Sequence, residues 1–312
     1  MMAIFKHTTV LLDEAVDALL VDINGIYIDG TFGRGGHSSL ILDRLGGSGK
    51  LMAVDRDPAA IEAGKARFRN ESRLCFRHSE FSRIGELAGE MGWQAKVSGL
   101  LLDLGVSSPQ LDAADRGFSF MNDGPLDMRM NPSAGPSASE WLQRVDLEDL
   151  VRVLKEYGEE RFARRIANAI VERRIHGPIE TTKELSQIID AAIPVRDPHK
   201  HPATRSFQAI RIQVNSELDE VRKVLEDSLA LLAIGGRLVV ISFHSLEDRL
   251  VKRFMRDNSR NRPLPKGIPI MESQQERPPL KLVGKALRPA PDEISANPRS
   301  RSAVMRVAER VA

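Results

Sequence analysis

The chain has 312 residues, of which 42% are hydrophobic and 28% charged, and these ordinary globular values exclude a wholly disordered protein. Its length predicts two domains. The single cysteine, Cys75, excludes an intramolecular disulfide and a cysteine-rich zinc site, and we expect no metal. Since no stretch approaches the roughly 20 apolar residues of a membrane helix, we expect a cytoplasmic protein with no membrane partner.

The net charge of +2 conceals an asymmetry along the chain. Residues 249–312 hold 15 Lys and Arg against 6 Asp and Glu, whereas the remainder is acidic. Eight prolines between residues 257 and 300 exclude a long amphipathic membrane-surface helix there. This basic segment predicts an anionic partner such as nucleic acid, although basic segments are also often plain solvated surface.

The first 110 residues alternate between strand and helix patterns. Apolar runs predict strands at 25–29, 50–55, 73–78 and 97–104, and helical spacing predicts helices at 10–20, 37–45, from Pro58 onward, and at 82–91. Thr8 and Thr9 are candidate N-caps of the first helix. Strands and helices in alternation predict right-handed crossovers and a parallel sheet.

The pattern changes after Pro109, and residues 131–139 form a turn-rich joint. Helices are predicted at 139–156, 159–175, 182–192 and 216–232, and further strands at 237–243, after a Gly235–Gly236 turn, and at 302–311. Thr181 and Glu184 match a capping box, and Gly158 and Gly177 are candidate C-caps. We therefore predict a discontinuous α/β domain over 1–110 and 213–312, interrupted by a helical domain at 111–212.

A glycine-rich loop, Asp29-Gly-Thr-Phe-Gly-Arg-Gly-Gly-His37, follows the first predicted strand. Twenty residues after Gly35 comes Asp55, at the end of the second strand, where a carboxylate can accept hydrogen bonds from a ribose diol. Ligands of open α/β sheets bind at the carboxyl ends of the strands. The loop and the acid together favour a nucleotide-type cofactor over a plain structural turn.

The spacing of the glycines bears on which cofactor binds. They stand at positions 30, 33, 35 and 36, which is not the G-x-G-x-x-G spacing of a dinucleotide site, so an NAD-linked oxidoreductase is disfavoured. Asp29 is poorly placed beside a pyrophosphate and well placed beside a cation. S-adenosylmethionine carries a sulfonium and an ammonium and no phosphate, so charge favours it. Phosphoryl transfer is disfavoured because G-x-x-x-x-G-K-[ST] is missing from the sequence.

The fourth predicted strand ends on Asp103, next to the predicted cofactor crevice. The loop after it offers Ser107, Ser108 and Gln110 as hydrogen-bonding groups. The pattern alone fits a polar strand exit equally well, but its place at the crevice favours a function. His244, which follows the strand at 237–243, is either close to the crevice or a supporting histidine.

At this point the chain resembles a known family over about residues 6 to 307, the bacterial small-subunit rRNA cytosine-N4 methyltransferases (RsmH, or MraW, family). The segments that carry the resemblance are His7-Thr-Thr-Val-Leu-Leu12, the glycine-rich loop, Leu102-Asp-Leu-Gly-Val-Ser-Ser-Pro-Gln-Leu111, Arg116-Gly-Phe-Ser-Phe120, Gly124-Pro-Leu-Asp-Met-Arg-Met130, Ala203-Thr-Arg-Ser-Phe-Gln-Ala-Ile-Arg211, Val214-Asn-Ser-Glu-Leu218, Ile241-Ser-Phe-His-Ser-Leu-Glu-Asp-Arg249 and Asn297-Pro-Arg-Ser-Arg-Ser302. The resemblance implies a class I, Rossmann-like, S-adenosylmethionine-dependent fold with a helical insertion. It also implies methylation of a cytidine N4 amine in the decoding region of 16S rRNA.

The resemblance assigns roles residue by residue. It places cofactor contacts on Gly35, Gly36, His37, Asp55, Phe81, Asp103 and Gln110. Phe81 would pack on the adenine, although without the family a core position is the better interpretation. The candidate RNA contacts are Arg116, Arg129, Arg205, Arg211, Arg299 and Arg301, each of which could instead form a surface salt bridge. Phe207, between Arg205 and Arg211, could stack on an extruded base.

The chemistry of the cytidine N4 amine indicates which residues are candidates for catalysis. The N4 lone pair is delocalised into the ring, so the enzyme must align the amine and accept its proton. Many amino-methyltransferases use an [Asp/Asn/Ser]-Pro-Pro-aromatic segment here, but this chain has no aromatic at that place. We predict that Asp103, Ser107 and Ser108 hold the amine. Cytosine C5 methylation needs a thiolate, and Cys75 lies in the third strand, away from the crevice.

The expected partner is 16S rRNA, within the small ribosomal subunit, and a homodimer is a further candidate assembly. A non-catalytic RNA-binding or assembly factor that retains the cofactor remains the alternative from another functional class. Intact motifs at the glycine-rich loop and after the fourth strand favour the enzyme.

Overall fold

The computed structural model describes residues 9–198, 201–261 and 277–312. The chain divides into two units, one from Met1–Gly105 and Asp219–Ala312 and the other from Val106–Leu218. The sequence predicted an insertion at 111–212. The first boundary falls at Gly105, which has a positive φ of 91°, and the second falls shortly after Ser216, whose φ is 51°. The first boundary therefore lies at a turn after a strand, and the second lies in the first turn of the helix Glu217–Leu231.

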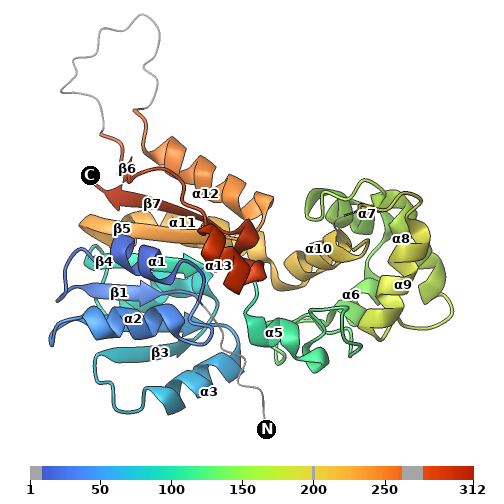
Figure 1. The fold of residues 1–312 in the computed structure, drawn as a ribbon, viewed down its shortest axis with the longest axis horizontal. Coiled ribbons are helices and arrows are strands. Elements are labelled where there is room, and N and C mark those ends of the chain that lie inside the picture. Colours follow the sequence, from blue (N-terminus) through green and yellow to red (C-terminus); the bar gives the residue numbers. More distant parts are fainter. Residues whose placement is uncertain (1–8, 199–200, 262–276) are drawn as a thin grey trace, which may run out of the picture. The chain divides into compact units, whose positions relative to one another are not determined.

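The first unit is built on a seven-stranded sheet with the order β3-β2-β1-β4-β5-β7-β6 (Figure 1). The strands are β1 (Ile26–Asp29), β2 (Lys50–Asp55), β3 (Leu74–His78), β4 (Val97–Asp103), β5 (Leu232–Ser242), β6 (Leu280–Leu282) and β7 (Val304–Arg310). Strands β1 to β5 pair in parallel, and β7 pairs antiparallel with β5 and β6. The predicted class I, Rossmann-like fold class is thus confirmed.

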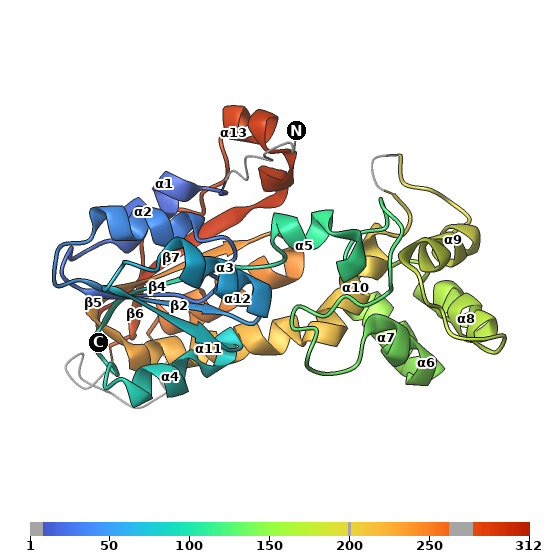
Figure 2. The ribbon, with the colours of Figure 1, turned by 90° about the horizontal axis from the view of Figure 1, so that it is seen from below.

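Helices cover both faces of this sheet because its central strands are apolar on both faces. One face packs on α1 (Leu12–Leu19), α2 (Gly36–Arg44) and α3 (Pro58–Arg67), and the other on α4 (Ile84–Glu90), α11 (Glu217–Leu231) and α12 (Ser245–Asn258). Tyr27 and Leu101 point to the first set and Ile28 and Leu100 to the second. Figure 2 shows α1 and α2 on one side of the sheet and α4 and α11 on the other.

The second unit is helical and has a hydrophobic core of its own. Its helices are α5 (Ser108–Asp112), α6 (Ala138–Arg144), α7 (Leu147–Glu156), α8 (Ala163–Arg174), α9 (Thr182–Ala192) and α10 (Thr204–Asn215). The single helix predicted at 139–156 is two helices, because Asp146 accepts a hydrogen bond from Asp149 N (2.8 Å) and caps α7. Helix α9 has its predicted bounds, and Thr181 Oγ1 accepts from Glu184 N (3.2 Å).

Two local predictions need correction, and some helices were not predicted. The N-cap of α1 is Leu11 and not a threonine; Thr8 lies outside the described residues. Strand β5 begins at Leu232, five residues earlier than expected, and includes Gly235 and Gly236. No prediction covered α5, α10 and α12.

The described part of the basic C-terminal segment, residues 249–312, folds into helices and strands of the first unit. It supplies most of α12, then β6, α13 (Pro291–Ala296) and β7. No helix within the described ranges is long and apolar enough to cross a membrane.

Candidate functional site

Three carboxylates end neighbouring strands at one edge of the sheet. Asp29 ends β1, Asp55 ends β2 and Asp103 ends β4, as parallel pairing of these strands requires. Burial raises the pKa of Asp29 and that of Asp55 to about 6 each, and raises the pKa of Asp103 well above its usual range. A cationic ligand at this edge would therefore favour the ionised, negatively charged form of these carboxyl groups.

Asp29 stabilises the glycine-rich loop by hydrogen bonds. Its carboxylate is only 1% exposed, and it accepts hydrogen bonds from Thr31 N (3.1 Å) and Ser38 Oγ (2.6 Å). Because this side chain is almost wholly buried, Asp29 would act on a ligand through its charge and not by direct contact.

Two glycines of this loop, Gly35 and Gly36, are required by close packing. Gly35 is the N-cap of α2 with φ 74°, and a Cβ there would lie 2.7 Å from the Phe32 ring. A Cβ on Gly36 would overlap the hydroxyl of Thr9. The N-terminal segment therefore lies directly against the loop.

Asp55 holds the other side of the loop. One carboxylate oxygen accepts from Gly33 N (2.7 Å) and the other from Asp57 N (2.8 Å). The Asp55 carbonyl accepts from Ser79 N (3.0 Å), which draws the turn after β3 towards it. Phe81 begins the 3₁₀ turn Phe81–Arg83 two residues later and is partly buried against the sheet core. Loop, acid and aromatic thus come from three successive strand ends.

Asp103 lies beside His37 and Thr31. Its backbone N–H donates to Thr31 Oγ1 (2.6 Å), and its Oδ2 lies 3.7 Å from His37 Nδ1. Its other oxygen, Oδ1, is buried and has no hydrogen-bond partner within the described residues. Burial is the main cause of its raised pKa, and the charges of Asp29 and Glu247 add to it. Oδ1 of Asp103 is therefore available to accept a hydrogen bond, and the carboxylate binds a proton more tightly than an ordinary one.

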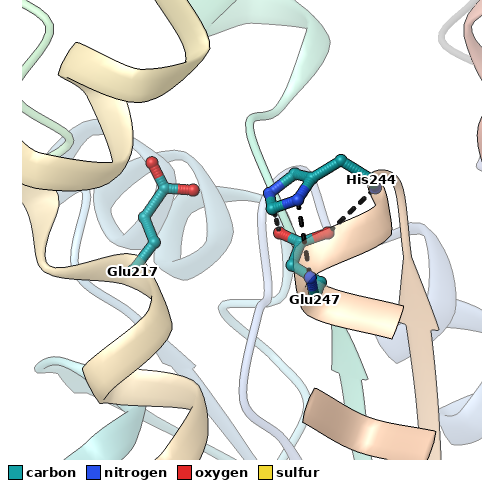
Figure 3. A group of neighbouring side chains, drawn as sticks. All are labelled: Glu217, His244 and Glu247. Carbon is teal, nitrogen blue, oxygen red and sulfur yellow. Dashed lines mark hydrogen bonds and ion pairs between the residues drawn. The ribbon is translucent and has the colours of Figure 1, made fainter. Parts of the chain in front are cut away.

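The side chains of His244 and Glu247 contact each other at the start of α12 (Figure 3). Glu247 is 1% exposed and accepts from Phe243 N (2.8 Å), while its other oxygen lies 3.1 Å from His244 Nε2. His244 caps the helix, as expected of a supporting histidine. Glu217, drawn in the same figure, belongs to the second unit and pairs there with Arg211.

The remaining cofactor and catalytic candidates belong to the second unit. Ser107 is the N-cap of α5, and its backbone N–H donates to Gln110 Oε1 (2.9 Å). Ser108 is the first residue of that helix. Gln110 is 6% exposed, so in this structure its amide serves the helix start. Their roles at the cofactor remain predictions.

Three of the candidate RNA-binding arginines are engaged within the second unit. Arg129 pairs with Asp127 (2.6 Å), and Arg211 makes two contacts of 2.8 Å with Glu217. Arg116 donates to the carbonyls of residues 129 and 130 at 3.2 and 2.9 Å. These side chains hold the fold together. Phe207 is 4% exposed in the helical core, so the prediction that it stacks on a base is wrong.

The other three arginines are more accessible. Arg205 lies partly exposed on α10 and lines a pocket of about 220 Å³ together with Arg161 and His201. Arg299 and Arg301 are exposed in the 3₁₀ turn Pro298–Ser302 of the first unit. These positions are the stronger candidates for contact with RNA phosphates.

Sequence reasoning missed two residues that support the carboxylates at the strand ends. Thr31 supports the backbone of Asp103, and Glu247 acts on Asp103 through its charge. The signal for Glu247 was weak, because the usual capping-box pattern begins with Ser or Thr and here the cap is His244. Nothing in the sequence pointed from Thr31 to a strand 72 residues away.

Comparison with known proteins gives a family match and several solved structures of similar fold. The model of the MraW methylase family matches residues 4–311. Among solved structures, an rRNA methylase from Streptococcus thermophilus is 9% identical, with a TM-score of 0.43 over 96% of this chain and 93% of that one. A SAM-dependent O-methyltransferase from Thermotoga maritima is 10% identical, with a TM-score of 0.41 over 99% of this chain and 69% of that one. The family assignment rests on the family model alone.

Proposed function

The chain belongs to the MraW methylase family and is an S-adenosylmethionine-dependent methyltransferase, and from this premise we propose that it methylates the exocyclic N4 amine of a cytidine. The proposed substrate lies in the decoding region of 16S rRNA, presented within the small ribosomal subunit in the cytoplasm. The observation that carries the proposal is the buried, unpartnered Oδ1 of Asp103 at the same sheet edge as the glycine-rich loop.

The residues of the first unit fit the cofactor. Each oxygen of Asp55 accepts one backbone hydrogen bond and keeps a second lone pair with which it can accept from a ribose hydroxyl. Phe81 supplies an apolar surface for the adenine, and Gly35 and Gly36 present bare backbone at the start of α2. The buried charges of Asp29 and Asp103 favour a cation over a pyrophosphate.

The bound cofactor supplies an electrophilic methyl group attached to a sulfonium. Transfer joins that carbon to N4 and leaves the former bonding pair on sulfur, so the amine must lose one proton. Ionised Asp103 accepts that proton, and its raised pKa makes it a stronger base than an ordinary carboxylate. In this proposal, Ser107 and Ser108 orient the amine by hydrogen bonds. Gln110 contacts the cofactor.

RNA binding is assigned to the accessible arginines. Arg299 and Arg301 are exposed and Arg205 is partly exposed. Their guanidinium groups are therefore better placed to meet phosphates than those of Arg129 and Arg211, which are held in internal ion pairs. Release of counterions from the RNA would make this contribution dependent on salt.

The test is single-turnover methyl transfer by Asp103→Asn and Ser107→Ala, with labelled cofactor and small ribosomal subunits that lack the modification. Cofactor affinity is measured separately by calorimetry. Removal of a general base typically slows the chemical step about 10²- to 10⁴-fold, and we expect Asp103→Asn to fall in that range. Full turnover in both variants with unchanged cofactor affinity refutes the assignment. Cofactor binding without any transfer by the unaltered protein favours a non-catalytic assembly factor.

A further inference from the structure

The peptide group between Val10 and Leu11 is hydrogen-bonded through both its C=O and its N–H to side chains of the first unit. The carbonyl of Val10 lies 3.2 Å from Nε2 of His37. The N–H of the same peptide bond, on Leu11, donates to Oε1 of Glu293 at 2.9 Å. Glu293 lies in α13, 282 residues further along the chain. The peptide therefore links a C-terminal helix to the histidine of the glycine-rich loop.

The hydrogen bond to Val10 requires a hydrogen on one particular ring nitrogen of His37. A carbonyl oxygen only accepts hydrogen bonds, so Nε2 of His37 must carry a hydrogen. In the neutral ring, Nδ1 then presents its lone pair, and this atom lies 3.7 Å from Oδ2 of Asp103. Once Asp103 has taken up a proton in the proposed transfer, Nδ1 of His37 can accept a hydrogen bond from the protonated carboxyl group. His37 is 4% exposed, which leaves little room for another ring orientation.

The peptide would not hold this position without support. Leu11 has φ 50° and ψ 40°, a left-handed conformation that a branched side chain adopts only when its surroundings impose it. Its backbone N–H stands at the start of α1, and no side chain of the N-cap residue satisfies that end. The carboxylate of Glu293 accepts this N–H and places negative charge at the positive end of the helix.

Two further contacts press the segment against the loop. Leu11 is 1% exposed in the core beneath α1 and α2. Thr9 lies so close to Gly36 that a Cβ there would overlap its hydroxyl. A shift of the Val10–Leu11 peptide would therefore be felt at Gly36 and at His37 together.

We propose that Glu293 is a positioning residue for methyl transfer, which acts through the Val10–Leu11 peptide to hold His37 as the Nε2–H form facing Asp103. This inference rests on the proposed role of Asp103. It gives the C-terminal segment around Asn297-Pro-Arg-Ser-Arg-Ser302 a function in the chemistry besides contact with RNA.

The test compares Glu293→Ala and Glu293→Gln with Asp292→Ala, an exposed neighbour in the same first turn of α13 that undergoes the same change of charge as Glu293→Ala. Nitrogen-15 NMR of the histidine rings in the full-length protein reports the tautomer of His37, which is assigned by its loss in His37→Gln. Single-turnover methyl transfer at saturating cofactor and thermal unfolding are measured on the same proteins.

We expect Glu293→Ala to lose the single Nε2–H form of His37 and to slow transfer at least tenfold. Glu293→Gln should stay within threefold of the unaltered protein, because an amide oxygen also accepts from Leu11 N, and Asp292→Ala should match the unaltered protein. A lower melting temperature in Glu293→Ala with the His37 spectrum and the rate unchanged would overturn the proposal and leave a plain helix cap. Equal losses in the Ala and Gln variants would also overturn it. Failure of the proposed function is distinguishable, since it appears as no transfer by the unaltered protein whatever the spectra show.

Discussion

Replacement of Asp55 by asparagine should weaken cofactor binding while leaving the folded chain close to its original stability. Asp55 is buried enough that its pKa rises from 3.8 to about 6. The folded protein therefore keeps a proton on this group at pH values where the unfolded chain has lost it, and the free energy of unfolding falls as the pH rises from about 4 to about 6. A shift of about two units at about 1.4 kcal/mol per unit makes this cost about 3 kcal/mol at pH 7.

The asparagine variant removes that charge but introduces a mismatch. Both carboxylate oxygens accept backbone N–H groups, from Gly33 and Asp57, and the amide nitrogen of asparagine must face one of these donors. A buried donor left without an acceptor costs about 1–3 kcal/mol, so at pH 7 the two effects roughly cancel. Relative to the unaltered protein, the decline in stability between pH 4 and pH 7 should be smaller by about 3 kcal/mol.

Cofactor binding should change much more than stability does at pH 7. A hydrogen bond from a ribose hydroxyl to a charged acceptor contributes about 1.5–3 kcal/mol, so its loss should raise the Kd about 10- to 150-fold. Calorimetric titration with S-adenosylmethionine and urea unfolding between pH 4 and pH 7 measure the two quantities. Asp43→Asn, at an exposed position on α2, is the control for the change of charge. A Kd within threefold of the original would refute the assignment of Asp55 to the ribose.

Further substitutions separate the other assignments. Cys75→Ala should keep its methyl-transfer rate within twofold, because this thiol lies in β3 away from Asp103; loss of transfer by a folded variant would reopen C5 methylation. Gly36→Ala should lower the free energy of unfolding by about 1–3 kcal/mol, since its Cβ overlaps Thr9, whereas Gly47→Ala, with open space around it, should not; equal effects in urea unfolding would contradict this. Arg211→Ala should cost about 3–5 kcal/mol of stability by stranding buried Glu217, and a small cost would show that the pair is dispensable. Arg205→Ala should leave stability unchanged and reduce the salt dependence of RNA binding by about one unit of slope, and an unchanged slope in filter binding would remove it from the interface.

The five parallel strands and their order along the chain were predictable because each is a short, largely apolar run between turn signals. Val97–Asp103 and Lys50–Asp55 are examples, and in both the acidic last residue marked the edge at which a ligand would bind. The three-residue strand β6 was not predicted. Helices that start on unusual caps were harder to find. Helix α12 starts on His244, and α10 follows a residue with no capping side chain, so neither has an ordinary N-terminal signal.

The roles of single side chains depended on contacts that sequence spacing does not reveal. Arg129 could be a phosphate ligand by its type, but Asp127 two residues earlier already binds it. Arg211 is likewise held by Glu217, on the next helix. The link from Glu293 to Leu11 joins residues almost a whole chain apart, and no periodicity can predict such a pair.

The central claim is the identity of the methylated atom. The most direct measurement mixes the protein with isotopically labelled S-adenosylmethionine and small ribosomal subunits that lack the modification, and then analyses the nucleosides by mass spectrometry. We expect label in N4-methylcytidine. Label in 5-methylcytidine or in another nucleoside would contradict it, even though the fold and the cofactor would stand.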